Sequence, residues 1–140
     1  MEFEDIRPFL EANHRAVVTT FQRNGAVQAS VVVCGLYQGH VALVSVRGNA
    51  TKIRNLRRDT RCTVLAVAAD WHSYVVVEGH AQLMDAANTE AEELRRCLRE
   101  VYRACGGGEH PHWEEYDRVM RERGEVVVLV HPDRIYGLLR

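Results

Sequence analysis

Apolar residues along the chain follow two different spacings, and the commoner one predicts β-strands. Short runs rich in valine, threonine and other β-branched residues alternate with turn residues, which is typical of strands joined by short connections. Asn24-Gly25 lies between the first two runs and is a strong hairpin signal. Residues 35–39 are predicted as a turn, and Pro132 is expected to end the last long strand. The predicted strands cover residues 16–21, 27–34, 40–46, 62–68, 74–84 and 126–130, with an extended segment at 135–138.

The remaining segments have helical spacing. Leu94, Leu98 and Val101 belong to one apolar stripe with intervals of three and four residues, which predicts an amphipathic helix. Asp5 is a candidate cap for a short first helix that has Pro8 in its first turn. The predicted helices cover residues 5–12, 51–58, 88–105 and 111–123.

Together these elements predict an α+β fold that is mainly β, a β-barrel with peripheral helices. Three strands contain unbroken valine runs, at residues 31–33, 75–77 and 126–128. A strand with one exposed face would alternate apolar and polar residues, so these runs predict cover on both faces. The barrel interior supplies one side, and a helix or a partner subunit supplies the other. We therefore expect an obligate homodimer.

Length and composition restrict the possible functions. The 140 residues fit one domain, predicted to span residues 1–140. Eighteen basic and nineteen acidic side chains leave a formal charge of −1, which argues against bulk attraction to nucleic acid or to an anionic membrane. No apolar run approaches the roughly 20 residues that span a bilayer, and the acidic first residues are unlike a signal peptide. We expect a cytoplasmic protein.

Cysteine and histidine spacing gives no metal site. The four cysteines contain no CxxC pair, so reduced and mostly buried thiols are expected. His110 and His112 are two residues apart beside a glycine-rich segment and have no evident third ligand. A surface loop explains them better than a metal centre.

The segment of residues 45–59 is the strongest candidate for binding chemistry. A strand end leads through a glycine-containing loop into a helix that begins with Thr51 and Lys52. Free N–H groups at a helix start, next to a lysine, form an anion site of the kind that phosphates occupy. A solvated basic helix and a nucleic-acid contact are the alternatives. The spacing is not that of a P-loop.

The combination of motifs resembles the pyridoxamine 5'-phosphate oxidase-like superfamily, and within it the deazaflavin-dependent (coenzyme F(420)) oxidoreductases. The resemblance covers nearly the whole chain, and its most specific part is the Lys-x-Arg-Asn-Leu-x-x-Asp block that starts at Lys52. The other matching segments are residues 16–20, 24–30, 71–79, 113–116 and 135–138. The resemblance implies a split β-barrel whose two-fold homodimer holds two cofactor sites at the subunit interface.

The resemblance also implies which residues hold the cofactor phosphate. Lys52 and Thr51 are expected to bind it, and Asn55 either contacts the phosphate or braces the loop. Members of this branch often have an arginine directly before the lysine, where this chain has Ala50. Arg47 is the residue that could replace it from the strand end.

Strand residues are expected beside the cofactor ring. Ser45 and Val46 lie at the strand end next to the phosphate loop, and Ser30 and Val32 on the neighbouring strand would flank the ring. Trp71 lies on a strand connection and is expected to come from the other subunit, where it stacks on the ring or simply packs at its rim.

The function that follows is an oxidoreductase in which coenzyme F(420), or alternatively FMN, passes a hydride to a small conjugated molecule. The cofactor supplies the chemistry, so no side chain is assigned as a catalytic acid or base. Two alternatives remain. One is a carrier or sensor that binds the cofactor without a substrate, and the other is a haem-binding or pyridoxal-phosphate-binding protein of the same fold.

Overall fold

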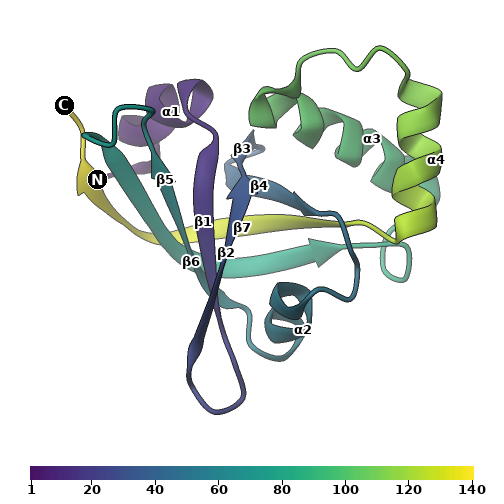
Figure 1. Cartoon of the computed structure of the whole chain (residues 1–140), viewed down its shortest axis with the longest axis horizontal. Helices are drawn as coiled ribbons and strands as arrows, with labels where there is room; N and C mark the ends of the chain where they lie inside the picture. The colour runs from purple at the N-terminus through teal and green to yellow at the C-terminus, as the bar shows by residue number, and fades with distance from the viewer.

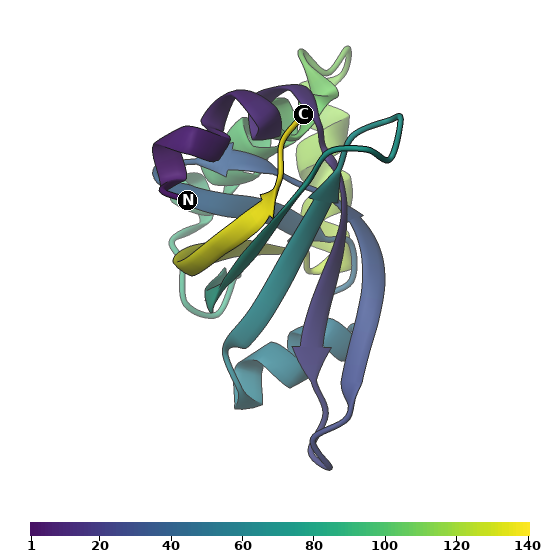
Figure 2. The ribbon, with the colours of Figure 1, turned by 90° about the vertical axis from the view of Figure 1, so that its left-hand side faces the viewer.

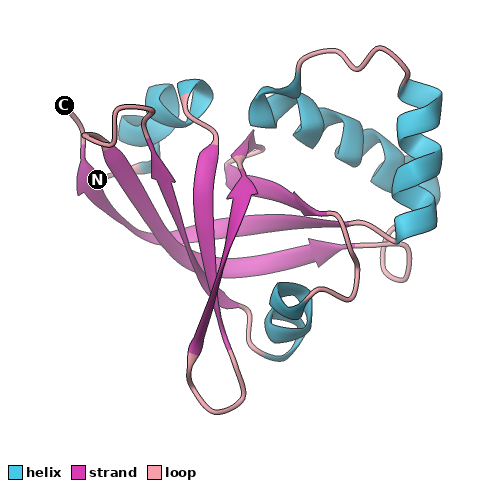
Figure 3. Cartoon of the chain, viewed as in Figure 1, coloured by secondary structure: helices cyan, strands magenta, loops and turns pink.

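The computed structural model describes residues 1–140 and is built on one antiparallel sheet (Figure 1). The strands follow in space the order β2-β1-β5-β6-β7-β4-β3, and each neighbouring pair is antiparallel. Their bounds are β1 Arg15–Phe21, β2 Val27–Val33, β3 Gly35–Tyr37, β4 His40–Ser45, β5 Arg61–Val67, β6 Tyr74–Met84 and β7 Val126–Leu138. The helices are α1 Phe3–Ala12, α2 Thr51–Arg58, α3 Ala91–Tyr102 and α4 Trp113–Arg123, with a π-helical turn at Arg103–Gly107 after α3 (Figure 3).

A β-bulge curls the sheet into a half-barrel. In the pairing of β6 with β7, Glu78 lies opposite Arg134 whereas Gly79 lies opposite Pro132, so Asp133 is an extra residue. A Cβ at Gly79 would lie 2.0 Å from the carbonyl oxygen of His131, so only glycine fits this bend. The curl, visible in Figure 2, brings β2 near β4 although the two strands do not pair. This split β-barrel confirms the predicted fold class.

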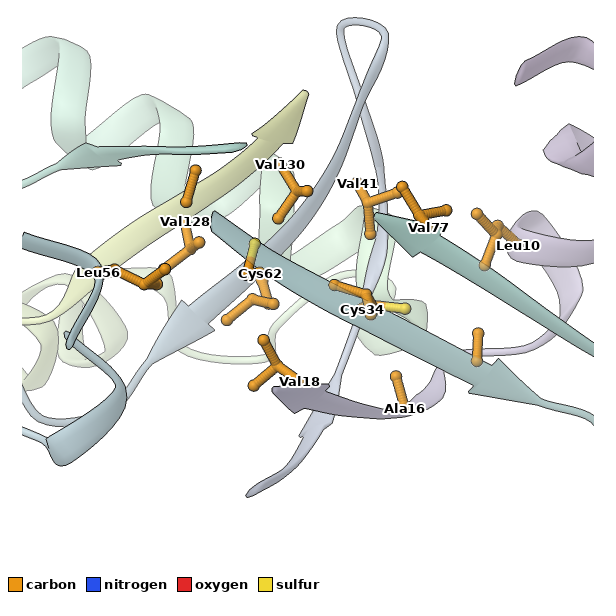
Figure 4. Packing of buried hydrophobic residues seen from close by; sticks show 14 of the residues in the cluster. Leu10, Ala16, Val18, Cys34, Val41, Leu56, Cys62, Val77, Val128 and Val130 are labelled. Atoms are coloured by element: carbon orange, nitrogen blue, oxygen red, sulfur yellow. The ribbon is translucent and has the colours of Figure 1, made fainter. Parts of the chain in front are cut away.

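Two layers of apolar side chains hold the fold together. The inner layer fills the curl of the sheet and includes Val18, Val41 and Val128 (Figure 4). The second layer lies between α3, α4 and the opposite face of β4 and β7, where Val127 and Leu129 contact the helices. Successive residues at the start of β7 therefore point into different layers, and both faces of the strand are buried over residues 126–130.

The valine runs at residues 75–77 and 126–128 are buried throughout, as predicted. The run at residues 31–33 is different, because no helix of this chain covers its outward face, and cover by a partner subunit stays a prediction. The side chains of Val31 and Val33 are 84% and 56% exposed, and Val27 on the same face is 58% exposed. The reason is that β2 is an edge strand whose outward face is covered by no helix of the chain.

Several predicted boundaries are also corrected. Residues 35–37, predicted within a turn, form the short strand β3 paired with β4. Pro132 does not end β7, because it lies at the bulge, where the missing N–H is tolerated. Asp5 is not the N-cap residue of α1, because the helix begins at Phe3 and Glu2 is its N-cap. The Asp5 carboxylate instead accepts a hydrogen bond from the Glu2 N–H at 2.8 Å. Pro8 consequently lies in the second turn.

The helices α3 and α4 begin later than predicted, at Ala91 and Trp113. Glu90 caps α3, since its carboxylate accepts hydrogen bonds from the N–H groups of Glu92 and Glu93. The bounds of α2 agree with the prediction.

All four cysteines are free, and only Cys105 is not fully buried, which confirms the expectation of mostly buried thiols. No helix is both long and apolar enough to cross a membrane. The cytoplasmic location stays a prediction.

Candidate cofactor-binding site

A groove of about 540 Å³ opens where the barrel is split, between β2 and the loop that joins β4 to α2. Valines of β2 and of the end of β4 form its apolar wall, and three cationic side chains lie along it. No carboxylate lines it. The lining residues are Arg15, Val31, Val32, Val33, Val44, Ser45, Val46, Arg47, Ala50 and Lys52.

The start of α2, where Ala50 and Lys52 line this groove, has unused backbone donors. Ala50 is the N-cap residue and has no side chain that could accept a hydrogen bond. Its carbonyl accepts from the N–H groups of Ile53 and Arg54, whereas those of Thr51 and Lys52 have no partner in the chain. Free N–H groups and the helix dipole both favour an anion here.

The loop before α2 is held tightly in place. Ser45 is buried, and its hydroxyl donates to the carbonyl oxygen of Arg47 at 2.8 Å. A Cβ at Gly48 would lie 2.4 Å from the carbonyl oxygen of Gly124, so the loop packs directly on the turn after α4. This packing fixes the direction in which α2 starts.

Lys52 is a cation without an ion-pair partner in the chain. Its side chain is half-buried, and burial lowers the pKa of its ammonium group. No carboxylate lies within 4.0 Å of Lys52, Arg47 or Arg15. Positive charge in this groove is therefore not neutralised by the protein.

A second hollow, of about 630 Å³, lies on the other side of the first turn of α2. It is lined only by polar and cationic residues, namely Gln22, Arg23, Thr51, Arg54, Asn55, Arg57 and Arg58. Arg57 is paired with Asp85 at 2.7 Å, but Arg23, Arg54 and Arg58 have no carboxylate partner. Arg54 donates to the Asn49 carbonyl oxygen at 2.6 Å and to the Thr51 hydroxyl at 3.2 Å. It thus brings a guanidinium to the loop beside Ala50.

The remaining residues proposed from the sequence lie in three places. Asn55 is buried, and its amide donates to the Thr20 hydroxyl at 3.0 Å, which braces α2 against β1. Ser30 lies on the same face of β2 as Val32, and its buried hydroxyl has no hydrogen-bond partner. Trp71 does not line the groove of its own chain; it is 80% exposed on the connection between β5 and β6.

Sequence reasoning did not find Arg15 and Arg23. The signal was available for Arg15, because the register set by the Asn24-Gly25 hairpin pairs it with Val33 at the groove. Arg23 lies in the hairpin turn, and only the curl of the sheet brings that turn beside α2.

Comparisons with known proteins agree with this architecture. A conserved hypothetical protein from Mycobacterium tuberculosis superposes with a TM-score of 0.76 at 22% identity, covering 98% of this chain and 84% of the other. An F(420) reductase gives a TM-score of 0.68 at 13% identity, covering 93% and 94%. A haem-binding protein from Mycobacterium smegmatis gives 0.70 at 21% identity, covering 97% and 53%. At these identities the likeness shows a shared fold.

The sequence itself matches the model of the pyridoxamine 5'-phosphate oxidase family over residues 3–138, nearly its full length. This match includes both walls of the groove and the whole of α2. The chain therefore belongs to the pyridoxamine 5'-phosphate oxidase family.

Proposed function

We propose that this protein is an oxidoreductase subunit that binds a flavin-type cofactor in the groove between β2 and the start of α2. The observation that carries the proposal is the composition of the groove. An apolar wall on two strands meets unpaired cations and free N–H groups, with no carboxylate among the lining residues. This arrangement suits a ligand with a flat apolar ring and a phosphate-bearing tail.

The residues fit such a cofactor in two parts. The phosphate would accept hydrogen bonds from Lys52, from Thr51 and from the backbone N–H groups at the start of α2. The ring would lie against Val32 and Val46, near the Ser30 hydroxyl, which lacks a partner within the chain. The bound cofactor supplies hydride transfer, while the protein orients it and excludes water. A small conjugated molecule is the proposed substrate.

The deazaflavin coenzyme F(420) is preferred over FMN because of the second hollow. A long phosphate-bearing tail can continue past the first turn of α2 to Arg23, Arg54 and Arg58, which carry charges not paired with carboxylates. FMN would leave this hollow unused. Arg54, which already reaches the loop beside Ala50, would fill the role of the arginine that this branch often has before the lysine.

The proposal includes a homodimer in which the second copy covers the outward face of β2. Val31 and Val33 are largely exposed there, yet they also line the groove. A partner placed on this face would bury both valines and close one side of the cofactor site. Trp71 of each chain is exposed and available to contribute across the interface.

Titration of the ligand-free protein with F(420), FMN and haem, followed by fluorescence and absorbance, tests the cofactor assignment. F(420) is expected to bind most tightly. Tighter binding of FMN would reverse the preference, and binding of haem alone would replace the redox proposal with the haem-binding alternative. Mixing the protein with reduced F(420) and menadione, a conjugated quinone, tests turnover. A cofactor that binds but is never oxidised there would favour a carrier or sensor.

A further inference from the structure

A separate cavity of about 250 Å³ lies between α3, α4 and the loop that follows β6. Its walls include the side chains of Leu94, Leu98 and Met120. Figure 1 shows the two helices on the side of the sheet away from α1. None of the residues of the cofactor groove lines this cavity.

The cavity contains a buried carboxylate that the fold does not satisfy. Glu125 lines it and is only 3% exposed, and one of its carboxylate oxygens has no hydrogen-bond partner. Burial raises the pKa of Glu125 to about 7, and the charge of Arg123 only partly opposes this. Burying a carboxylate without a partner is costly, and sites with such groups are often functional.

The neighbouring charged and titratable groups do not neutralise Glu125. On α3, Arg95 is engaged with Glu92 and with Asp117 of α4. On α4, the Tyr116 hydroxyl donates to the Leu98 carbonyl oxygen, and burial raises the pKa of Tyr116.

Backbone groups make the cavity favourable for a cation. Arg121 also lines the cavity, but Arg123 is the basic residue whose charge acts on Glu125. The α4 helix ends at Arg123, and its C-cap residue Gly124 lines the cavity, where a helix C-terminus carries partial negative charge. The N-terminus of α3, which would attract an anion, is already capped by the Glu90 carboxylate.

We propose that this cavity binds a small organic amine, with its apolar body between α3 and α4 and its ammonium group on the Glu125 carboxylate. The volume fits this class, because an engineered apolar cavity of about 150 Å³ in another protein holds benzene. A phenyl ring with a short aminoalkyl chain is somewhat larger. Such a ligand would give Glu125 the partner that the chain does not supply.

The test compares 2-phenylethylamine with 2-phenylethanol, which has the same apolar body but no charge. Binding is followed by calorimetry and by amide NMR shifts. At pH 8 the amine is expected to bind at least about tenfold more tightly than the alcohol, with shifts at Leu94, Leu98 and Met120. With a pKa of about 7, Glu125 is mostly protonated at pH 6, so the affinity for the amine should fall about tenfold there.

Glu125→Gln should abolish both the preference for the amine and its pH dependence. Glu122→Gln removes an exposed carboxylate in the last turn of α4, three residues before Glu125, and is the matched control, expected to bind like the parent. Equal affinity for amine and alcohol, no binding of either, or an unchanged preference in Glu125→Gln would each overturn the proposal. Should Glu125→Gln fail to fold, the comparison of pH 6 with pH 8 on the parent protein still decides.

Discussion

Replacing Lys52 by alanine is the most direct test of the proposed cofactor site. The lysine lies in the first turn of α2, beside two N–H groups without partners and with no carboxylate nearby. Partial burial lowers the pKa of its ammonium group and so makes the charge costly without a partner. A phosphate would therefore meet a partly buried charge that is free of competing ion pairs.

The expected loss follows from the strength of one charged contact. A hydrogen bond to a charged group contributes about 1.5–3 kcal/mol, and about 1.4 kcal/mol corresponds to a factor of ten. Lys52→Ala should thus weaken cofactor binding about ten- to a hundredfold. Binding should not vanish, because Arg47, Arg15 and the backbone donors remain. The fold should survive, since the lysine head group contacts no buried polar partner.

Fluorescence titration of parent and variant at low salt measures this loss. Arg96→Ala is the matched control, because Arg96 is exposed on α3, makes no ion pair and lies outside the groove. Raising the salt concentration should narrow the gap between Lys52→Ala and the parent through screening. A Lys52→Ala variant that binds as tightly as the parent at low salt would refute the assignment of the phosphate to the start of α2.

Three other features give predictions. Val31→Asp places a charge on the exposed face of β2 and should dissociate the proposed dimer in sedimentation velocity; a variant as dimeric as the parent would show that this face is not the interface. Gly79→Ala puts a Cβ 2.0 Å from the His131 carbonyl oxygen and should lower the free energy of unfolding in urea by at least about 2 kcal/mol; unchanged stability would mean that the bulge tolerates a side chain. The pKa of Glu125 is raised from 4.5 to about 7, so between these pH values the native state binds more protons than the unfolded state. The free energy of unfolding should therefore fall by up to about 3 kcal/mol as the pH rises from 4.5 to 7. Glu125→Gln should remove this decline.

Local patterns were sufficient for the helices and the longer strands, but not for the short strand β3, which forms by pairing with β4. The bounds of α2 agreed with prediction, since Thr51 follows a glycine loop and apolar Ile53 and Leu56 lie on the buried side. The expectation that Pro132 ends the strand was wrong, because the bulge in the pairing of β6 with β7 removes the need for an N–H group at this position. Nothing near Pro132 in the sequence indicates the bulge, which depends on Gly79 of another strand.

The groove was only partly predictable for the same reason. Arg47 and Lys52 come from one continuous segment, so a loop-to-helix pattern was enough to suggest them. Arg15 reaches the groove from a different strand, which requires the register of the hairpin and the curl of the sheet. The exposure of Val31 and Val33 could not be predicted from the sequence either. A run of valines looks the same in the sequence whether a helix of the chain covers its outer face or leaves it exposed.

The position of these two valines couples the proposed dimer to the proposed cofactor. Val31 and Val33 are exposed and also line the groove, so a second copy on this face would both bury them and complete the site. A ligand that binds the dimer and not the monomer stabilises the dimer by about 2.7 kcal/mol per site at a hundred times its dissociation constant. Saturating F(420) should therefore lower the dimer dissociation constant by about a hundredfold for each site, and less in Lys52→Ala at the same cofactor concentration. Sedimentation across a dilution series with and without cofactor measures this directly. A dimer dissociation constant that does not change with cofactor would show that the groove is complete within one chain.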